Sequence, residues 1–184
     1  SAFFHALLTP WYDTTEANQQ WDRREAKFLE VFGAIFGSVP QIAVAATNHG
    51  QVKDMFELLA VVTTSMREHN KVSKTIFMKG LNQLLPTILR SFQVYAAQPA
   101  VLGSILDLLF AIFDSVTTML TTEFVQQVMG MFLTFFTKEQ IESLSLPGGQ
   151  SKSLILEKFF QILKLLVSTR SNLFKPFFSG DCGT

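Results

Sequence analysis

Residues 101–136 read VLGSILDLLFAIFDSVTTMLTTEFVQQVMGMFLTFF and contain no lysine or arginine. The only charged side chains in this stretch are those of Asp107, Asp114 and Glu123. Apolar residues recur there every three or four positions, which is the period of an amphipathic helix. Thr121 and Thr122 interrupt the pattern, and threonine favours the N-cap of a helix. The stretch therefore predicts a hairpin of two helices whose wide apolar faces are buried on more than one side.

The same stretch is too interrupted to be read as a membrane span. A spanning helix needs roughly 20 mostly apolar residues in a row. The longest uninterrupted apolar run, from Leu108 to Phe113, is about a third of that length. Asp107, Asp114 and the threonines break the remainder at helical spacing. We therefore expect a protein core here and no membrane insertion.

The composition fits a densely packed domain with no strong electrostatic partner. Of the 184 residues, 48% are hydrophobic and 16% are charged. This share of charge is low, because an average protein has about a quarter. The formal net charge is zero, which argues against nucleic acid, because nucleic-acid binding depends on a basic surface.

The cysteine count and the start of the chain suggest its context. A single cysteine, Cys182, excludes an internal disulfide and favours a reducing compartment. With no initiator Met and no signal pattern, we expect an excised fragment of a longer protein.

Helical periodicity continues on both sides of the hairpin. Two capping-box patterns support it, one at Asp13–Glu16 and one at Thr137–Gln140. Pro86 lies inside a helical pattern and predicts a kink there. Pro147 with the two glycines after it predicts a loop. The further helices that we expect are the end of one at residues 1–8, one through Trp21, Phe28, Val31, Phe32 and Ile35 that stops at Gly37 and Pro40, one from Val52 to Met66, one from Phe77 to Tyr95, a short one toward Leu144, one over 151–169, and one opening at Asn172.

The helix pairs recur along the chain. Pairs begin near Gln51, Gln98 and Ser151, so the spacings are about 47 and about 53 residues, a period typical of paired-helix repeats. This period predicts an all-α fold, an α-α superhelix of HEAT or armadillo type in which each antiparallel pair covers its neighbour. The expected repeats are 1–48 (partial), 50–96, 98–145 and 150–184 (truncated). A globular helical bundle is the alternative that periodicity leaves open. Because a cut solenoid lacks capping repeats, we expect the chain to self-associate.

Catalytic chemistry has no pattern in this sequence. His5, His49 and His69 lie far apart and are interpreted as surface residues, and no glycine-rich phosphate-binding motif occurs. Asp107 and Asp114 lie two turns apart on one helix face. They are interpreted as a solvated or partner-facing strip, with a carboxylate site as the alternative. We therefore expect no enzyme activity, no metal and no cofactor.

The polar residues of the second helix in each pair are better candidates for partner binding than the Phe-rich helix. In paired-helix solenoids one helix of each pair lines the concave face. The alternative for each residue is ordinary solubility. The Phe-rich segment from Phe124 to Phe136 is interpreted as core, with a cargo groove as the alternative. The candidate partner-facing residues are Lys79, Gln83, Arg90, Gln126 and Gln127.

Three segments carry a resemblance to the karyopherin-β (importin-β) family of nuclear transport receptors. They are LLTPWYDTTEANQQW (7–21), FLTFFTKEQIESL (132–144) and LEKFFQILKLLVSTRSNLFKPF (156–177). The resemblance is to the C-terminal half of a nuclear export receptor. It implies a HEAT-repeat superhelix that shuttles between nucleus and cytoplasm.

In that family, an export receptor binds protein cargo together with Ran·GTP and releases it on GTP hydrolysis. The resemblance further implies actin, recognised with profilin, as the cargo. The major Ran contacts of the family lie in N-terminal repeats. Many karyopherins are strongly acidic whereas this chain is neutral, so the resemblance supports no electrostatic cargo site here. The alternative is an α-solenoid scaffold of a stable complex that acts without Ran.

Overall fold

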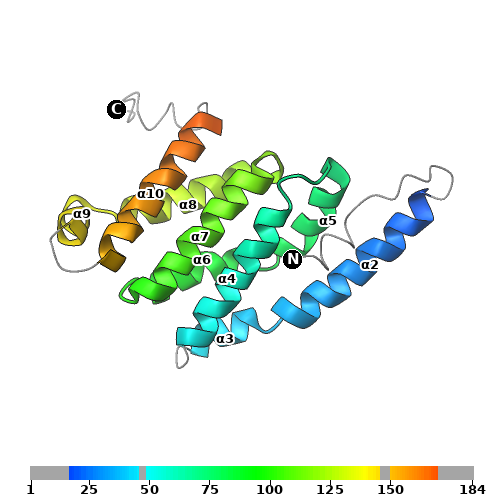
Figure 1. Ribbon diagram of the computed structural model, residues 1–184, viewed down its shortest axis with the longest axis horizontal. Helices are drawn as coiled ribbons and strands as arrows, with labels where there is room; N and C mark the ends of the chain where they lie inside the picture. The colour runs from blue at the N-terminus through cyan, green and yellow to red at the C-terminus, as the bar shows by residue number, and fades with distance from the viewer. Residues whose placement is uncertain (1–16, 46–48, 146–149, 170–184) are drawn as a thin grey trace.

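Helices joined by short turns make up the described part of the protein (Figure 1). The computed structural model describes residues 17–45, 49–145 and 150–169, and it places no strand in these ranges. The expected all-α fold is therefore confirmed. The helices are α2 (Ala17–Phe36), α3 (Val39–Ala45), α4 (His49–Ser65), α5 (Lys71–Leu81), α6 (Leu85–Val94), α7 (Pro99–Val116), the 3-10 turn η1 (Thr117–Met119), α8 (Thr122–Phe135), α9 (Lys138–Ser145) and α10 (Gln150–Thr169).

The helices stack in two layers. In the first layer α7 packs against α4 on one side and α10 on the other, and these three lie side by side in Figure 1. In the second layer α2 packs against α5 and α3 against α6, with α8 following. The first-layer helices begin at His49, Pro99 and Gln150, so they recur at a nearly constant spacing. This stacking is that of the expected helical-repeat solenoid.

The middle helix of the first layer, α7, explains the apolar stretch. Thirteen of its eighteen residues are buried. By length and composition alone the segment Pro99–Met119 could cross a membrane, but 67% of that window is buried inside the protein. Gly103 is buried because α10 covers its side of the helix, with Lys158 Nζ 3.9 Å from where a Cβ on Gly103 would lie.

Two breaks in the second layer differ from the sequence-based expectation. The single kinked helix expected from Phe77 to Tyr95 is two helices, α5 and α6, with Pro86 in the first turn of α6. The stop expected at Gly37 and Pro40 is a similar break, because α3 follows α2 after two residues and contains Pro40. Proline is tolerated in a first turn, where its missing N–H is not needed.

The two breaks lie side by side, because α2 packs on α5 and α3 packs on α6. The close approach of α2 and α5 depends on Gly80. A Cβ on this residue would lie 2.8 Å from Cδ1 of Phe32, so no larger residue fits without a shift. The α2–α3 and α5–α6 parts of the second layer are thus each broken into two helices, whereas α8 is continuous.

Aromatic rings fill the space between the layers, as the core interpretation of the Phe-rich helix predicts. Phe124, Phe132 and Phe136 are buried, whereas Phe135 is only half-buried. The ring of Phe136 stacks on that of Phe159 in α10, with centroids 3.9 Å apart. This stack joins the end of α8 to the last described helix.

The helix starts use side-chain caps. The Thr121 hydroxyl accepts a hydrogen bond from the Phe124 N–H at 3.2 Å, as expected of an N-cap. Thr137 accepts one from the Gln140 N–H at 3.4 Å, which confirms the first half of that capping box. Four other expectations lie outside the described residues: the helix end at 1–8, the box at 13–16, the loop at 147–149 and the helix from Asn172.

We predict that Tyr95→Phe destabilises the protein by about 1 kcal/mol, the usual net value of one hydrogen bond. The buried Tyr95 hydroxyl donates a hydrogen bond to the Ala43 carbonyl oxygen at 3.0 Å and so connects α6 to α3.

Burial raises the pKa of Tyr95 above its ordinary value of 10.0. A raised folded-state pKa stabilises the protein below the unfolded-state pKa, and this stability is lost as pH rises through the folded-state value. Urea unfolding should show that the wild type has a lower free energy of unfolding above pH 10 than at pH 8, and that Tyr95→Phe lacks this decrease. Identical curves would contradict the assignment.

Candidate partner-binding surface

The five candidate partner-facing residues are all exposed and all belong to the second layer. Lys79 lies on α5, Gln83 in the turn before α6, and Arg90 on α6, while Gln126 and Gln127 lie on α8. They do not form one cluster. The Lys79 ammonium donates a hydrogen bond to the Glu25 carboxylate on α2, so it links two second-layer helices. Which of the five contacts a partner stays a prediction.

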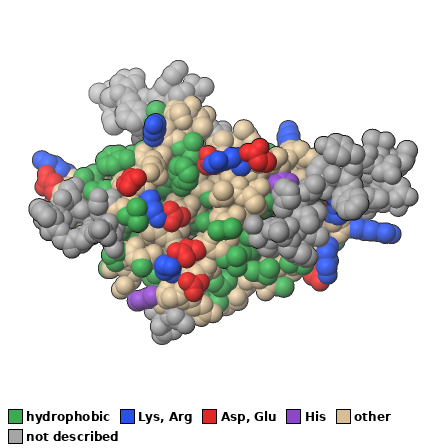
Figure 2. Space-filling view, viewed as in Figure 1, with side chains coloured by type: hydrophobic (Ala, Val, Ile, Leu, Met, Phe, Trp, Pro, Cys, Tyr) green, Lys and Arg blue, Asp and Glu red, His purple; other side chains and the backbone are tan. Residues whose placement is uncertain are grey.

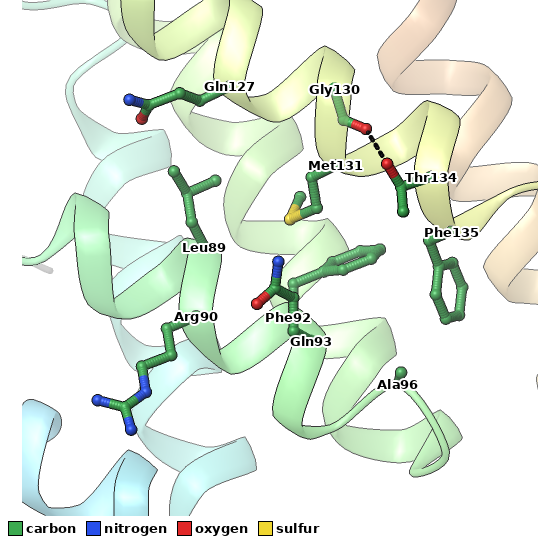
Figure 3. A pocket seen from close by; sticks show the side chains of 10 residues that line it. All are labelled: Leu89, Arg90, Phe92, Gln93, Ala96, Gln127, Gly130, Met131, Thr134 and Phe135. Carbon is green, nitrogen blue, oxygen red and sulfur yellow. Dashed lines mark hydrogen bonds between the residues drawn. The ribbon is translucent and has the colours of Figure 1, made fainter.

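Arg90 and Gln127 both line a groove between α6 and α8, on opposite sides of Leu89 in Figure 3. Its volume is about 620 Å³, within the range of pockets that hold ligands. Gln83 and Gln126 lie outside it. The residues that line the groove are Leu89, Arg90, Phe92, Gln93 and Ala96, which belong to α6 and the turn after it, and Gln127, Gly130, Met131, Thr134 and Phe135 on α8.

The groove has an apolar floor and a polar rim. Phe92 is only 1% exposed, and its ring lies 5.1 Å from that of Phe135, so the two rings bridge the helices from below. Leu89 and Met131 are half-buried and point into the hollow in Figure 3. Such a surface can hold apolar side chains while the rim supplies hydrogen bonds.

Small residues keep the groove open. Ala96 lines it on the α6 side and Gly130 on the α8 side, and a Cβ on Gly130 would meet nothing within 4 Å. The Gly130 carbonyl accepts a hydrogen bond from the Thr134 hydroxyl at 2.8 Å, drawn as the dashed line in Figure 3. The sequence alone did not predict this hollow, because a glycine on an exposed helix face occurs in many structural settings.

A smaller hollow of about 270 Å³ lies on the other side of α6, next to α3. Arg90 lines both hollows, and within the described ranges no carboxylate lines either of them. Arg90 forms no ion pair with any described residue. Its guanidinium is therefore available to a carboxylate from outside. The other lining residues of the smaller hollow are Pro40, Ala43, Pro86, Thr87, Ser91 and Val94.

Asp107 and Asp114, interpreted from the sequence as a solvated or partner-facing strip, each lie beside a cation of this chain. Asp107 accepts a hydrogen bond from Lys158 on α10, and Asp114 pairs with Arg67, which follows α4. Each carboxylate thus meets a cation from a different neighbour. Both cations come from distant parts of the sequence, so the sequence alone did not reveal these pairs. On the face drawn in Figure 2, acidic and basic side chains are interspersed.

In the described ranges no group of three or more His, Cys, Asp or Glu side chains is placed so that it could hold a metal ion. His49 is exposed, and its ring lies 5.7 Å from that of Tyr95. His69 was expected at the surface and is buried, because it lies in the tight turn that joins α4 to α5. His5 lies outside the described residues.

We predict unequal costs for the two halves of the Asp107–Lys158 ion pair. The Lys158 side chain is 17% exposed and that of Asp107 is 45% exposed. Asp107→Ala leaves a largely buried ammonium with only the Gly103 carbonyl at 3.5 Å. This substitution should cost about 1 kcal/mol after allowance for solvent screening. Lys158→Met should cost less, because methionine fills the same space and leaves an accessible carboxylate. Urea unfolding of both variants tests this, and a larger cost for Lys158→Met would contradict it.

Comparison with known proteins gives one consistent result. No family model matches the chain, and no solved structure matches it. The chain is similar to exportin-6 of Danio rerio (25% identical over 179 residues, 95% of this chain), to exportin-6-B of Xenopus laevis (27% over 186 residues, 96%) and to exportin-6 of Dictyostelium discoideum (29% over 179 residues, 92%). It spans only 16–17% of the length of these relatives. These matches confirm the resemblance to an export receptor that the three quoted segments carry.

Proposed function

We propose that this chain is a segment of a nuclear export receptor of the karyopherin-β family. The observation that carries the proposal is the similarity to exportin-6 proteins over 92–96% of the chain, on a stack of helix pairs that suits a HEAT superhelix. The receptor binds cargo and catalyses no reaction. It moves between nucleus and cytoplasm.

An uncovered apolar stripe on α10 supports the view that the solenoid continues beyond the described helices. The buried side of α10 carries Ile155, Phe159, Ile162 and Leu166. A second stripe at the next positions of the same helix, Leu156, Phe160, Leu163 and Val167, is half-buried or exposed, and Phe160 is 53% exposed. A first-layer helix with neighbours on both sides needs two such faces, as α7 has. A following repeat would cover the second stripe.

The mechanism that we propose is coupled binding through curvature. Each repeat contacts only its neighbours, so small rotations between repeats add up along the solenoid. Ran·GTP and cargo each favour the same curvature, and each therefore raises the affinity for the other by the same factor. Actin, presented with profilin, is the cargo that we propose. GTP hydrolysis removes the contribution of Ran and releases the cargo.

A scaffold for a stable protein complex is the alternative function. The two-layer stack and the neutral charge suit a scaffold equally well, and only dependence on Ran separates the two proposals. A scaffold binds its partners with the same affinity whether or not Ran·GTP is present.

We predict that the full-length protein containing this chain recovers actin and profilin from nuclear extract only when GTP-locked Ran is added. The matched control is Ran loaded with GDP, which should recover neither protein above background. Recovery of other cargo under Ran·GTP would keep the export function and overturn the actin–profilin assignment. Equal recovery with both forms of Ran would overturn the export function in favour of the scaffold.

We also predict that the isolated chain forms dimers as its concentration rises, because the second stripe of α10 is uncovered. Phe160→Ser should weaken the self-association by about tenfold or more, since it removes one large apolar contact from an interface. Leu133→Ser is the control, because Leu133 is 59% exposed on α8 and lies outside the stripe. Sedimentation velocity measures both variants. A clean monomer at high concentration, or equal effects of the two substitutions, would contradict the prediction.

A further inference from the structure

The smaller hollow, between α3 and α6, differs in chemistry from the groove on the other side of α6. Its volume is about 270 Å³, just below the roughly 300 Å³ at which pockets for drug-sized ligands begin. It therefore suits one small chemical group better than a whole ligand. Pro40 and Ala43 make its α3 wall apolar, and Pro86 and Val94 add apolar surface from α6.

The polar lining of this hollow comes from one face of α6 and can donate hydrogen bonds. Thr87, Arg90 and Ser91 line it, and their spacing of three and four residues places them on the same side of the helix. In Figure 3 the Arg90 guanidinium points away from α8 and toward a pale blue ribbon of the N-terminal helices. Because α3 packs on α6, this direction leads to the side of the helix where the small hollow lies.

The three polar side chains of this lining are not used within the described part of the protein. Ser91 is only 2% exposed, yet its hydroxyl has no hydrogen-bond partner among the described residues, and the same holds for the Thr87 hydroxyl and the Arg90 guanidinium. A buried hydroxyl without a partner is unfavourable, so native structures contain few of them. No side chain caps the start of α6 either, although Thr87 lies in its first turn. The first-turn N–H groups therefore also lack a side-chain partner.

A phosphate group matches this set of donors better than a carboxylate does. A phosphate monoester carries a charge of about −1.5 to −2 and has three acceptor oxygens, so it can pair with Arg90 and still accept from both hydroxyls. The positive end of the α6 dipole also favours an anion at the first turn. The apolar wall lowers the local dielectric and so strengthens the attraction.

We propose that the hollow between α3 and α6 binds a phosphate group through Arg90, Thr87 and Ser91. Two sources supply this chemistry, namely free inorganic phosphate and the phosphorylated side chain of a partner protein. The inference does not rest on export, since a scaffold could use the same site.

The experiment is an NMR titration of the whole chain, labelled with ¹⁵N. The probes are sodium phosphate and a phosphoserine blocked at both ends, each compared with sodium chloride at the same ionic strength. We expect saturable shifts of the Thr87 and Ser91 amide signals with both probes. Tighter binding of the blocked phosphoserine would support a phosphorylated partner as the source, and tighter binding of inorganic phosphate would support the free ion.

Substitutions on α6 test whether the proposed side chains hold the phosphate. Arg90→Gln should weaken the affinity about tenfold, because it removes a charge-assisted hydrogen bond. Ser91→Ala and Thr87→Val should each weaken it about fivefold, because each removes a neutral donor. The matched control is Arg23→Gln, since Arg23 is exposed on α2 and lines neither hollow. It should leave the affinity unchanged.

Urea unfolding separates binding from folding in these variants. Ser91→Ala should be at least as stable as the wild type, because it removes a buried hydroxyl that has no partner among the described residues. A weaker affinity in a variant of unchanged stability then reports a lost contact with phosphate.

Three results would overturn the proposal. The first is the absence of a saturable shift with either phosphate probe. The second is an equal effect of Arg90→Gln and Arg23→Gln on the affinity, which would show attraction to the net charge alone. The third is binding of a blocked aspartate as tight as that of the blocked phosphoserine, which would make the hollow a carboxylate site.

Discussion

The burial of α7 between α4 and α10 is the constraint on which the packing of the other described helices depends. A helix covered on both sides by its own layer, and by the second layer beneath, must be apolar nearly all round. Each buried Leu, Ile or Phe stabilises the protein by roughly 1.5–3 kcal/mol, whereas a partly exposed ion pair contributes about 0–1 kcal/mol. Packing therefore provides the stability of the first layer. The ion pairs of Asp107 with Lys158 and of Asp114 with Arg67 connect α7 to α10 and to the turn after α4.

This constraint also explains which parts of the fold the sequence could predict. Helical period and capping residues are local, so the two helices of the hairpin and the cap at Thr121 were predictable from neighbouring residues. The break at Pro86 was not, because a proline inside an unbroken apolar period permits a kink as well as a break. The choice depends on the α2–α3 break that packs beside it and lies much earlier in the chain.

For the candidate site, the sequence could predict only which helix faces carry exposed polar residues. Exposed polar positions on second-layer helices include Arg90 and Gln127, which follows from helical period alone. The hollow between them depends on how far apart α6 and α8 lie, and the rings of Phe92 and Phe135 set that distance from below. His69, Asp107 and Asp114 show the same limit. Their environment is decided by residues from other helices, which a single sequence does not reveal.

The two layers differ in how easily the spacing between their helices can change. The first layer consists of continuous helices. In the second layer the chain is broken between α2 and α3 and between α5 and α6, and hollows lie on both sides of α6. A change in solenoid curvature moves the two layers by different amounts, and the broken layer can alter its spacing with less loss of packing.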